Sequence, residues 1–448
     1  MHEASGLASQ VVFGWSPLWV SSILLIATYI VIITDRFNRA IVAGLGASLM
    51  VTLGVINQRT AVSGIDFNTL GLLAGMMVLV AITRGSGVFQ YVAIWSAKKV
   101  DARPWGILVM LALVTAVFSS LLDNVTTVLL IAPVTLLICH ELKIKPYPFL
   151  FAEIFASNIG GTATLIGDPP NIMIGSAVGL SFNDFLFNLG PVVPLILVIT
   201  LAIFYLLWGR DMEASDEARA RVMKFRERDA ITDLRLLKQS LFVFTLVIIG
   251  FLTAHHLQLE PATIALFGAA ILLLLANLNN NAEEQSEEVG KIFADVEWIT
   301  VFFFIGLFIV VKGVEEAGVL SILADLVIHH TGGDLAITAL TILWVSAIAS
   351  ALVDNIPFVA TMIPLIKSMA PIFGGAENLM PLWWSLALGA CLGGNGSLVG
   401  ASANLIVAGF AERAGHRIRF LPFMLMAFPM MLISIVISSA YVYLRYLW

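Results

Sequence analysis

The chain has 448 residues, of which 59% are hydrophobic and 12% are charged, and its formal net charge is −6. Soluble domains are about 45–50% apolar and about 25% charged, so this composition excludes a soluble enzyme. The negative net charge and the lack of a basic tract exclude a nucleic-acid binder. Two cysteines, Cys139 and Cys391, are too few for a disulfide framework.

Apolar stretches of about 20 residues, the length of a membrane-crossing helix, recur along the chain. They do not alternate apolar and polar residues as the strands of an outer-membrane barrel do. An all-α polytopic membrane protein is therefore expected. The stretches predict full-length helices at roughly 17–34, 40–57, 67–83, 184–208, 239–255, 261–278, 297–313 and 421–446. Two further apolar segments, 148–180 and 381–414, are interrupted by Gly, Pro and Asn, which predicts broken helices.

The positive charges of the loops predict the orientation in the membrane. The polar stretch 209–238 is rich in Lys and Arg, which places it in the cytoplasm, and the start of the chain, which has no Lys or Arg, falls outside. Segment 104–140 has basic residues on both flanks and Asp123-Asn124 at its middle. It is expected to be a re-entrant helical hairpin with its tip buried in protein, because bare backbone cannot face lipid. The alternative is two ordinary crossings joined by a tight outside turn.

The two halves of the chain resemble each other at a nearly fixed offset. Three blocks of residues recur in the same order, which is strong evidence for an internal repeat. Two blocks recur 231 residues later: Asp66, Thr69, Gly75 and Gly87 as Glu297, Thr300, Gly306 and Gly318, and Leu122 to Val125 with Pro133 as Val353 to Ile356 with Pro364. The third block recurs at 233: Gly160 to Thr164, Gly167 and Asn171 as Gly393 to Ser397, Gly400 and Asn404.

In the predicted orientation the first repeat starts outside and the second starts inside, so the repeats are inverted. The expected organisation is a first repeat at 1–208, a cytoplasmic loop at 209–238 and a second repeat at 239–448, with about five transmembrane helices in each repeat. Inverted repeats with broken helices at matching positions are typical of secondary transporters, whereas a channel is a weaker alternative.

Two symmetry-related carboxylates, Asp123 and Asp354, lie deep in the predicted membrane region. An ionisable residue at such depth is by default a functional hypothesis. Both are candidates for proton coupling, and a carboxylate there could instead coordinate Na⁺. The alternative is that each caps the helix that follows it, because Asp is a good N-cap.

The broken segments supply the candidate substrate contacts. Polar side chains there and beside the two aspartates would line the gap: Asn124, Asn158, Thr162, Thr164, Asn171, Asn355, Asn395, Ser397 and Asn404. The backbone breaks are assigned to Gly160, Gly161, Asp168, Pro169, Pro170, Gly393 and Gly394. No matching Arg or Lys accompanies these residues, which favours a small neutral solute or ion over a dicarboxylate. Close helix packing through small residues is the alternative explanation of the glycines.

The Asp-Asn tips and the run Gly167-Asp168-Pro169-Pro170-Asn171 resemble the ArsB/NhaD branch of the ion transporter superfamily, particularly its P-protein-like permeases. The resemblance covers roughly 18–446. It implies paired scaffold and transport regions, opposed hairpins, a homodimer in many members and a soluble ATPase partner in some arsenite pumps. Sodium–dicarboxylate relatives carry Ser at the tip positions where this chain has Asp123 and Asp354, which favours proton coupling here.

The sequence therefore predicts a proton-coupled antiporter, embedded in the lipid bilayer of a bacterial or archaeal inner membrane, that extrudes arsenite or antimonite by an elevator-like cycle. No cofactor or bound metal is expected, and H⁺, or alternatively Na⁺, is the coupling ion. Two alternatives stay open: a Na⁺/H⁺ antiporter, and an anion or carboxylate symporter, for which Lys367 is the candidate cationic group.

Overall fold

The computed structural model describes residues 11–34 and 36–448, so the prediction for the first residues of the chain lies outside the described part. All described elements are helical. The first half contains α1 (Pro17–Ile33), α2 (Arg39–Thr52), α3 (Gln58–Ser63), α4 (Phe67–Arg84), α5 (Val88–Lys99), α6 (Pro104–Leu121), α7 (Asn124–Leu142), α8 (Tyr147–Gly161), α9 (Pro169–Val178), α10 (Phe182–Asn188) and α11 (Val192–Phe204). The second half contains α12 (Asp216–Met223), α13 (Leu234–Leu257), α14 (Pro261–Asn277), α15 (Ala282–Ala294), α16 (Trp298–Glu316), α17 (Val319–Thr331), α18 (Leu335–Leu352), α19 (Asn355–Ser368), α20 (Met380–Gly393), α21 (Ser402–Arg413) and α22 (Phe420–Val442).

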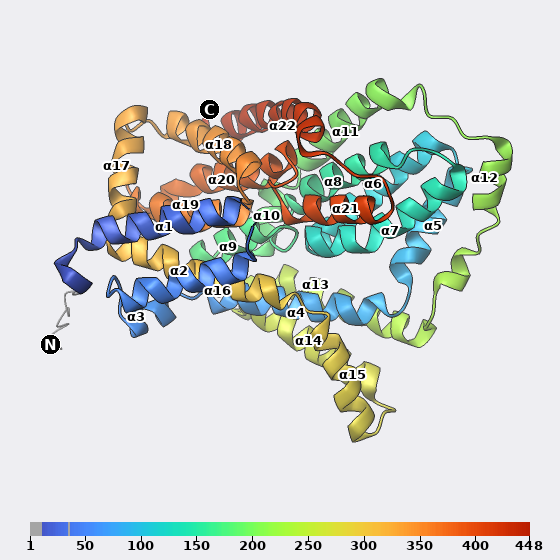
Figure 1. The fold of residues 1–448 in the computed structure, drawn as a ribbon, viewed down its shortest axis with the longest axis horizontal. Coiled ribbons are helices and arrows are strands. Elements are labelled where there is room, and N and C mark those ends of the chain that lie inside the picture. Colours follow the sequence, from blue (N-terminus) through green and yellow to red (C-terminus); the bar gives the residue numbers. More distant parts are fainter. Residues whose placement is uncertain (1–10, 35) are drawn as a thin grey trace.

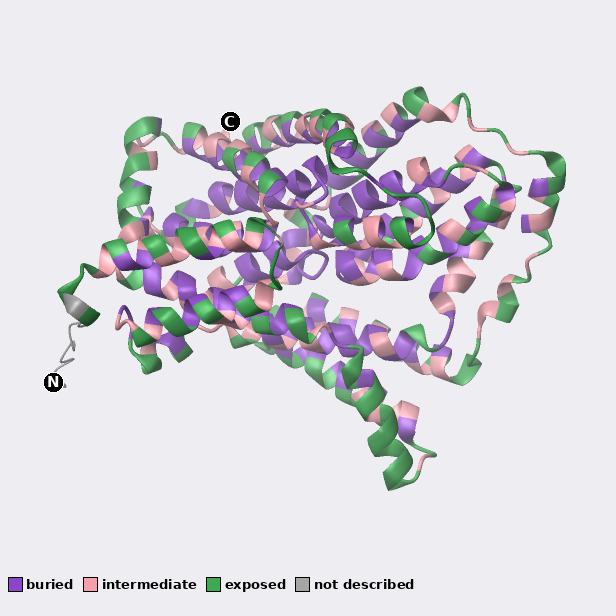
Figure 2. Ribbon diagram, in the orientation of Figure 1, coloured by how far each residue is buried: buried purple, intermediate pink, exposed green. Residues whose placement is uncertain are grey.

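Within the described residues, eight helices are long and apolar enough to cross a membrane: α4, α6, α7, α11 with its extension to Gly209, α13, α16, α18 and α22 with its extension to Leu447. Large apolar side chains cover the outer surface of several of them, such as Phe242 and Ile249 on α13. Exposed residues gather on the outer helices, and most residues of the central helices are buried (Figure 2). This distribution fits a protein surrounded by lipid. The expected all-helical membrane fold is confirmed.

Two details of the predicted helices are wrong. The single helix expected at 184–208 is divided into α10 and α11 around Leu189–Pro191, where Pro191 lacks the N–H needed to continue a helix. The helix expected at 40–57 ends earlier, at Thr52. The short helices α5 and α17 were not anticipated, because 12 and 13 residues fall below the length of a full span.

The internal repeat recurs in the positions of the helices. Helices α4, α5, α6 and α7 begin 231 residues before α16, α17, α18 and α19, and α8 and α9 begin 233 residues before α20 and α21. The turn before α5 and the turn before α17 both use a left-handed glycine, Gly87 and Gly318, with φ of +79° in each case. Helices α5 and α17 lie at opposite ends of the molecule (Figure 1), as inverted repeats require.

The helices form two groups that mix elements of both repeats. We call α1–α4 and α13–α16 the scaffold group, in which α4 packs on α14 and α2 on α16. We call α6–α11 and α18–α22 the hairpin group, in which α6 packs on α8 and α18 on α20. In Figure 1 most of the scaffold group lies below the hairpin group, and α15 projects away from both.

Each repeat contributes one helical hairpin, α6–α7 and α18–α19, with an aspartate at the turn. Asp123 accepts a hydrogen bond from the backbone N–H of Thr126 at 2.8 Å, and Asp354 accepts one from that of Ile356 at 3.2 Å. Both aspartates are therefore N-caps of the second helix of their hairpin. Asp123 is only 6% exposed, so the first tip is buried in protein, but α6 and α7 are each long enough to cross a membrane, and the re-entrant hairpin stays a prediction. The membrane sides remain a prediction.

Candidate functional site

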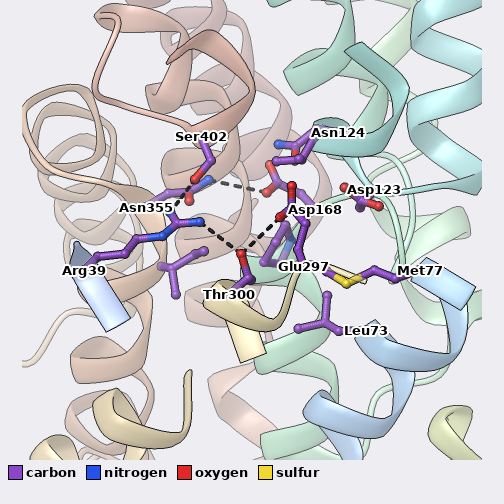
Figure 3. Close-up of a pocket in the computed structure, with 13 residues that line it drawn as sticks. Arg39, Leu73, Met77, Asp123, Asn124, Asp168, Glu297, Thr300, Asn355 and Ser402 are labelled. Atoms are coloured by element: carbon purple, nitrogen blue, oxygen red, sulfur yellow. Dashed lines mark hydrogen bonds between the residues drawn. The ribbon is translucent and has the colours of Figure 1, made fainter. Parts of the chain in front are cut away.

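A small cavity lies where the scaffold group meets the two hairpin tips (Figure 3). Its volume is about 20 Å³, room for about one water molecule. The scaffold group contributes Arg39, Leu73, Met77, Glu297 and Thr300, and the hairpin group contributes Asp123, Asn124, Val125, Asp168, Pro169, Asn355, Ile356 and Ser402. Residues from both repeats and both groups thus converge on one point, as in a carrier whose site is made at the interface of its repeats.

The two tip asparagines belong to this cavity, as the repeat suggests. The side-chain amide of Asn124 donates to Oδ1 of Asn158 at 3.2 Å, and that of Asn355 donates to Oδ1 of Asp168 at 3.4 Å. Each asparagine is 3% exposed. Their positions in the first turn of α7 and α19 fix them beside the cavity, because the preceding aspartate holds each helix start in place.

Asp168 is the most deeply buried carboxylate of the cavity. It precedes Pro169 and Pro170, which start α9 after the break in the first broken helix. Its side chain is fully buried, and its Oδ2 has no hydrogen-bond partner in the described part of the chain. An ionised carboxylate so placed carries a large desolvation cost unless a proton or a cation compensates it. Sequence reasoning assigned Asp168 to the backbone break alone, whereas its side chain lines the cavity.

Arg39 is the cationic group of the cavity, and the sequence analysis did not place it among the site residues. Its Nη1 lies 2.9 Å from Oδ2 of Asp354 and donates to Oγ of Ser402 at 2.6 Å. Its Nη2 donates to Oγ1 of Thr300 at 3.0 Å, and its guanidinium lies over the ring of Phe303, 5.2 Å from the centroid. The expectation that no arginine or lysine accompanies the site is therefore wrong.

Glu297 and Thr300 are the second-repeat counterparts of Asp66 and Thr69. Their recurrence in the sequence could have identified them as candidate site residues, but it was used only as evidence for the repeat. Thr300 donates to Oε2 of Glu297 at 3.1 Å beside the cavity. Asp66 instead accepts from Thr69 at 2.6 Å and from Ser176 of α9 at 2.9 Å, away from the hairpin tips. Each repeat thus places an acidic residue before a scaffold helix, Asp66 before α4 and Glu297 before α16, and each residue lies beside the hairpin group.

Several expected substrate contacts are occupied in holding the broken helices. The amide of Asn171 donates to the carbonyl oxygens of Thr162 and Thr164 at 3.2 and 2.9 Å. In the other repeat, the amide of Asn404 donates to those of Gly394 and Ser397 at 2.8 Å each. These four carbonyls lie at the breaks, where helical hydrogen bonds end. Both asparagines are fully buried and face backbone instead of the cavity.

The hydroxyls of the broken segments are used in the same way. Thr164 donates to the carbonyl oxygen of Ser120, and Ser397 donates to that of Ala351, both at 2.5 Å. The hydroxyl of Thr162 donates within its own helix, to Asn158, at 2.7 Å. Thr164 and Ser397 thus join each broken helix to its hairpin, and none of the three hydroxyls lines the cavity.

Asn158 connects the cavity to the centre of the hairpin group. Its amide donates to Oδ1 of Asn395 at 3.0 Å and to Oδ1 of Asn404 at 3.1 Å, while its own Oδ1 accepts from Asn124. The amide nitrogen of Asn395 has no partner in the described part of the structure. The first hairpin tip is therefore tied through Asn158 to both broken helices.

The paired glycines allow helices to approach closely. A Cβ atom on Gly160 would lie 2.2 Å from the carbonyl oxygen of Ala116, and one on Gly393 would lie 2.5 Å from that of Ala347. A Cβ atom on Gly161 would lie 2.5 Å from the carbonyl oxygen of Gly167, and one on Gly394 would lie 3.2 Å from that of Gly400, in each case across the break. These contacts are helix packing, and the glycines keep each hairpin against its broken helix.

Lys367, the cationic group expected for an anion site, lies elsewhere. It lines a second cavity of about 210 Å³ with Asp66, Ser176, Lys312 and Glu315, between the outer ends of α16 and α19 and the start of α4. Lys312 pairs there with Glu315 at 3.0 Å and with Glu316 at 2.9 Å. The cavity at the hairpin tips therefore has Arg39, and not Lys367, as its cation.

Comparisons with known proteins agree on the family. Residues 29–389 match the model of the CitMHS family, described as citrate transporters. The chain is 43% identical over 431 residues to an uncharacterized transporter of Mycobacterium tuberculosis, covering 95% of this chain and 98% of that one. It is 33% identical to the P protein of Sus scrofa, covering 94% of this chain and 59% of the P protein. The P-protein resemblance inferred from the motifs is confirmed, and the ArsB assignment stays a prediction.

A solved structure shows the same fold. The YdaH transporter of Alcanivorax borkumensis aligns with a TM-score of 0.60 at 14% identity, covering 97% of this chain and 99% of that one. At this identity the likeness concerns the arrangement of helices alone. It confirms the expected all-helical membrane-protein fold, which is like that of the YdaH transporter.

Proposed function

The chain belongs to the CitMHS family, described as citrate transporters, and we propose that it is a proton-coupled carrier of a small carboxylate anion. The observation that carries the proposal is Arg39 at the hairpin tips, within 2.9 Å of Asp354. A guanidinium can bind a carboxylate with two parallel hydrogen bonds, a geometry that a lysine cannot offer. The preference for neutral arsenite or antimonite rested on the ArsB resemblance and on the lack of such a group, and Arg39 removes the second of these arguments.

Coupling to protons follows from the other charges of the cavity. If Arg39 and Asp354 neutralise each other, then Asp123, Asp168 and Glu297 remain, and no described lysine or arginine pairs with them within 4.0 Å. An anion could not enter a cavity lined by three ionised carboxylates. It could enter once these groups hold protons or a cation. Each anion transported through this site would therefore be accompanied by protons or another cation.

Transport through this site requires the two groups of helices to move. A cavity of about 20 Å³ is far below the several hundred Å³ of typical small-molecule sites, so a carboxylate has no room in this conformation. The scaffold group supplies one wall and the hairpin group supplies the other. A relative displacement of the two groups, as in an elevator-like cycle, would open the cavity and expose it to one side at a time.

The experiment is uptake into proteoliposomes that contain the purified protein. Radiolabelled citrate, succinate and arsenite are offered separately under an imposed inward proton gradient, an inward Na⁺ gradient, or neither. We expect accumulation of a carboxylate that depends on the proton gradient and that an uncoupler abolishes. Arg39→Gln should abolish it, while Arg36→Gln, an exposed arginine in the same loop, should not. Accumulation of arsenite and of no carboxylate would replace the proposal, and Na⁺-driven proton movement alone would indicate a cation exchanger.

A further inference from the structure

The ion pair between Arg39 and Asp354 joins the two groups of helices at the cavity. We propose that the transported anion competes with Asp354 for Arg39, so that this ion pair locks the empty carrier and the substrate releases it. The inference rests on the proposed function, because it gives the carboxylate cargo a competitor within the protein. It assigns Arg39 a second role, as the residue that couples occupancy of the site to the contact between the two groups.

Arg39 is held on the scaffold side independently of Asp354. It occupies the first position of α2, after the N-cap Asn38. A positive charge is unfavourable at this end of a helix, so the helix itself does not stabilise it there. Thr300 and the ring of Phe303, both on α16, hold the guanidinium over the cavity. The guanidinium would therefore stay in place when its partner across the interface leaves.

The contact with the hairpin group is of the kind that a substrate can replace. Only Nη1 of Arg39 meets Asp354, and it shares that contact with Ser402. The second carboxylate oxygen of Asp354 is engaged by the backbone N–H of Ile356. The side chains are 25% and 14% exposed, so water reaches the pair. A free carboxylate could bind the guanidinium through two oxygens and would compete well against a single-point, partly hydrated partner.

Among the described residues, this ion pair is present only at the second hairpin, α18–α19. Asp123, the repeat partner of Asp354, caps its helix in the same way but has no ion pair within the described residues. Helix α14, the counterpart of α2, begins with Pro261 where α2 begins with Arg39. The contact thus depends on the end of α2 facing the second hairpin tip, and it would be lost when the two groups slide past each other.

A proton on Asp354 would act in the same direction as the substrate. Protonation removes the charge that holds Arg39, and anion binding to Arg39 leaves Asp354 without its partner, so each event favours the other. The other titratable groups close to this pair are Glu297 at the start of α16, Asp168 before α9, and Tyr29 of α1, whose hydroxyl donates to the carbonyl oxygen of Pro357 at 2.6 Å. Because Asp354 and the transported anion share one guanidinium, binding of one anion to Arg39 would favour binding of one proton to Asp354.

The first test needs no ligand. Thermal unfolding of the purified protein is compared for wild type, Arg39→Gln, Asp354→Asn and the double variant. Asn is also a good N-cap, so Asp354→Asn should keep the start of α19. If the pair locks the empty carrier, the double variant will lose less than the sum of the two single losses in melting temperature. Strictly additive losses would overturn the lock. Arg36→Gln controls for the loss of a positive charge in the same loop.

The second test measures citrate binding by calorimetry at pH 8. We expect Asp354→Asn to bind citrate about tenfold more tightly than wild type, because the internal competitor is gone. Weaker binding by this variant would overturn the competition. Arg39→Gln should not bind, and Arg39→Lys should bind weakly because it keeps the charge without the two-pronged geometry.

The two tests separate the inference from the proposed function. If wild type binds no carboxylate while the double-mutant cycle is non-additive, the proposed function and the competition both fail. The ion pair would then only hold the two groups of helices together. If wild type binds citrate while the cycle is additive, the proposed function stands and the lock fails. Tighter binding by Asp354→Asn together with a non-additive cycle supports the complete inference.

Discussion

Replacing Gly160 by alanine tests how the first hairpin is held against its broken helix. The added methyl would lie 2.2 Å from the carbonyl oxygen of Ala116 and 2.5 Å from its Cα. Carbon atoms in contact normally stay about 3.5–4.0 Å apart, so α6 and α8 would have to separate by about 1 Å. Overpacking of this kind costs about 1–3 kcal/mol, and alanine returns about 0.5–1 kcal/mol of helix propensity. We expect a net loss of about 1–2 kcal/mol.

The assay is thermal unfolding in detergent, followed by tryptophan fluorescence, with two companion variants. Gly393→Ala should behave like Gly160→Ala, because its methyl would lie 2.5 Å from the carbonyl oxygen of Ala347. Gly409→Ala is the matched control: Gly409 lies within α21 and has nothing within 4 Å of the added methyl, so it should be neutral or slightly stabilising. If Gly160→Ala unfolds at the same temperature as Gly409→Ala, the close contact between α6 and α8 is refuted.

Three further predictions use other parts of the structure. Asn404→Leu should lower the free energy of unfolding by about 2–4 kcal/mol, because it leaves the buried carbonyl oxygens of Gly394 and Ser397 without a hydrogen-bond donor. Thermal unfolding measures this loss, and unchanged stability would contradict the prediction. Asp123→Asn should fold normally, since Asn can cap α7, and should lose proton-driven accumulation in proteoliposomes by at least about tenfold; normal coupling would remove Asp123 from the mechanism. The hydrogen bond from Lys98 lowers the pKa of Glu227, so this contact persists above the ordinary glutamate pKa and is lost as the pH falls through the lowered value. Glu227→Gln should therefore speed hydrogen exchange of residues 224–231 at neutral pH, whereas the exposed Glu217→Gln should not.

The repeat made much of the fold predictable. Recurring residues at one offset relate the starts of α16 and α19 to those of α4 and α7, because both blocks contain the acidic residue that precedes the helix. Helix α18, whose start at Leu335 lies outside the recurring blocks, was not among the predicted helices. Helix lengths were harder to predict. Pro191 divides a stretch that is apolar throughout, and a hydropathy pattern cannot distinguish a short interruption from a continuous span.

The site was only partly predictable for a physical reason. Asp123, Asn124 and Asn355 could be found because they recur at hairpin tips. The direction in which a polar side chain points cannot be read from its type, so Asn171 and Asn404 looked like substrate contacts although they bind backbone carbonyls. Arg39 lies 315 residues from Asp354 in the chain, and the packing of α2 on α16 and of α16 on α19 brings the two together.

The two repeats have matching helices but unequal charges, and the inequality bears on how a carrier could be coupled. Asp354 has Arg39 as a partner, whereas its counterpart Asp123 has none among the described residues. Asp168 is a buried carboxylate, and the residue 233 positions later is Ala401. Two equivalent proton sites would bind protons equally in both orientations of the hairpin group. Since the charges differ, the proposed carrier would protonate Asp123 and Asp168 and release the Arg39 contact in separate events, which the substrate would link in a fixed order.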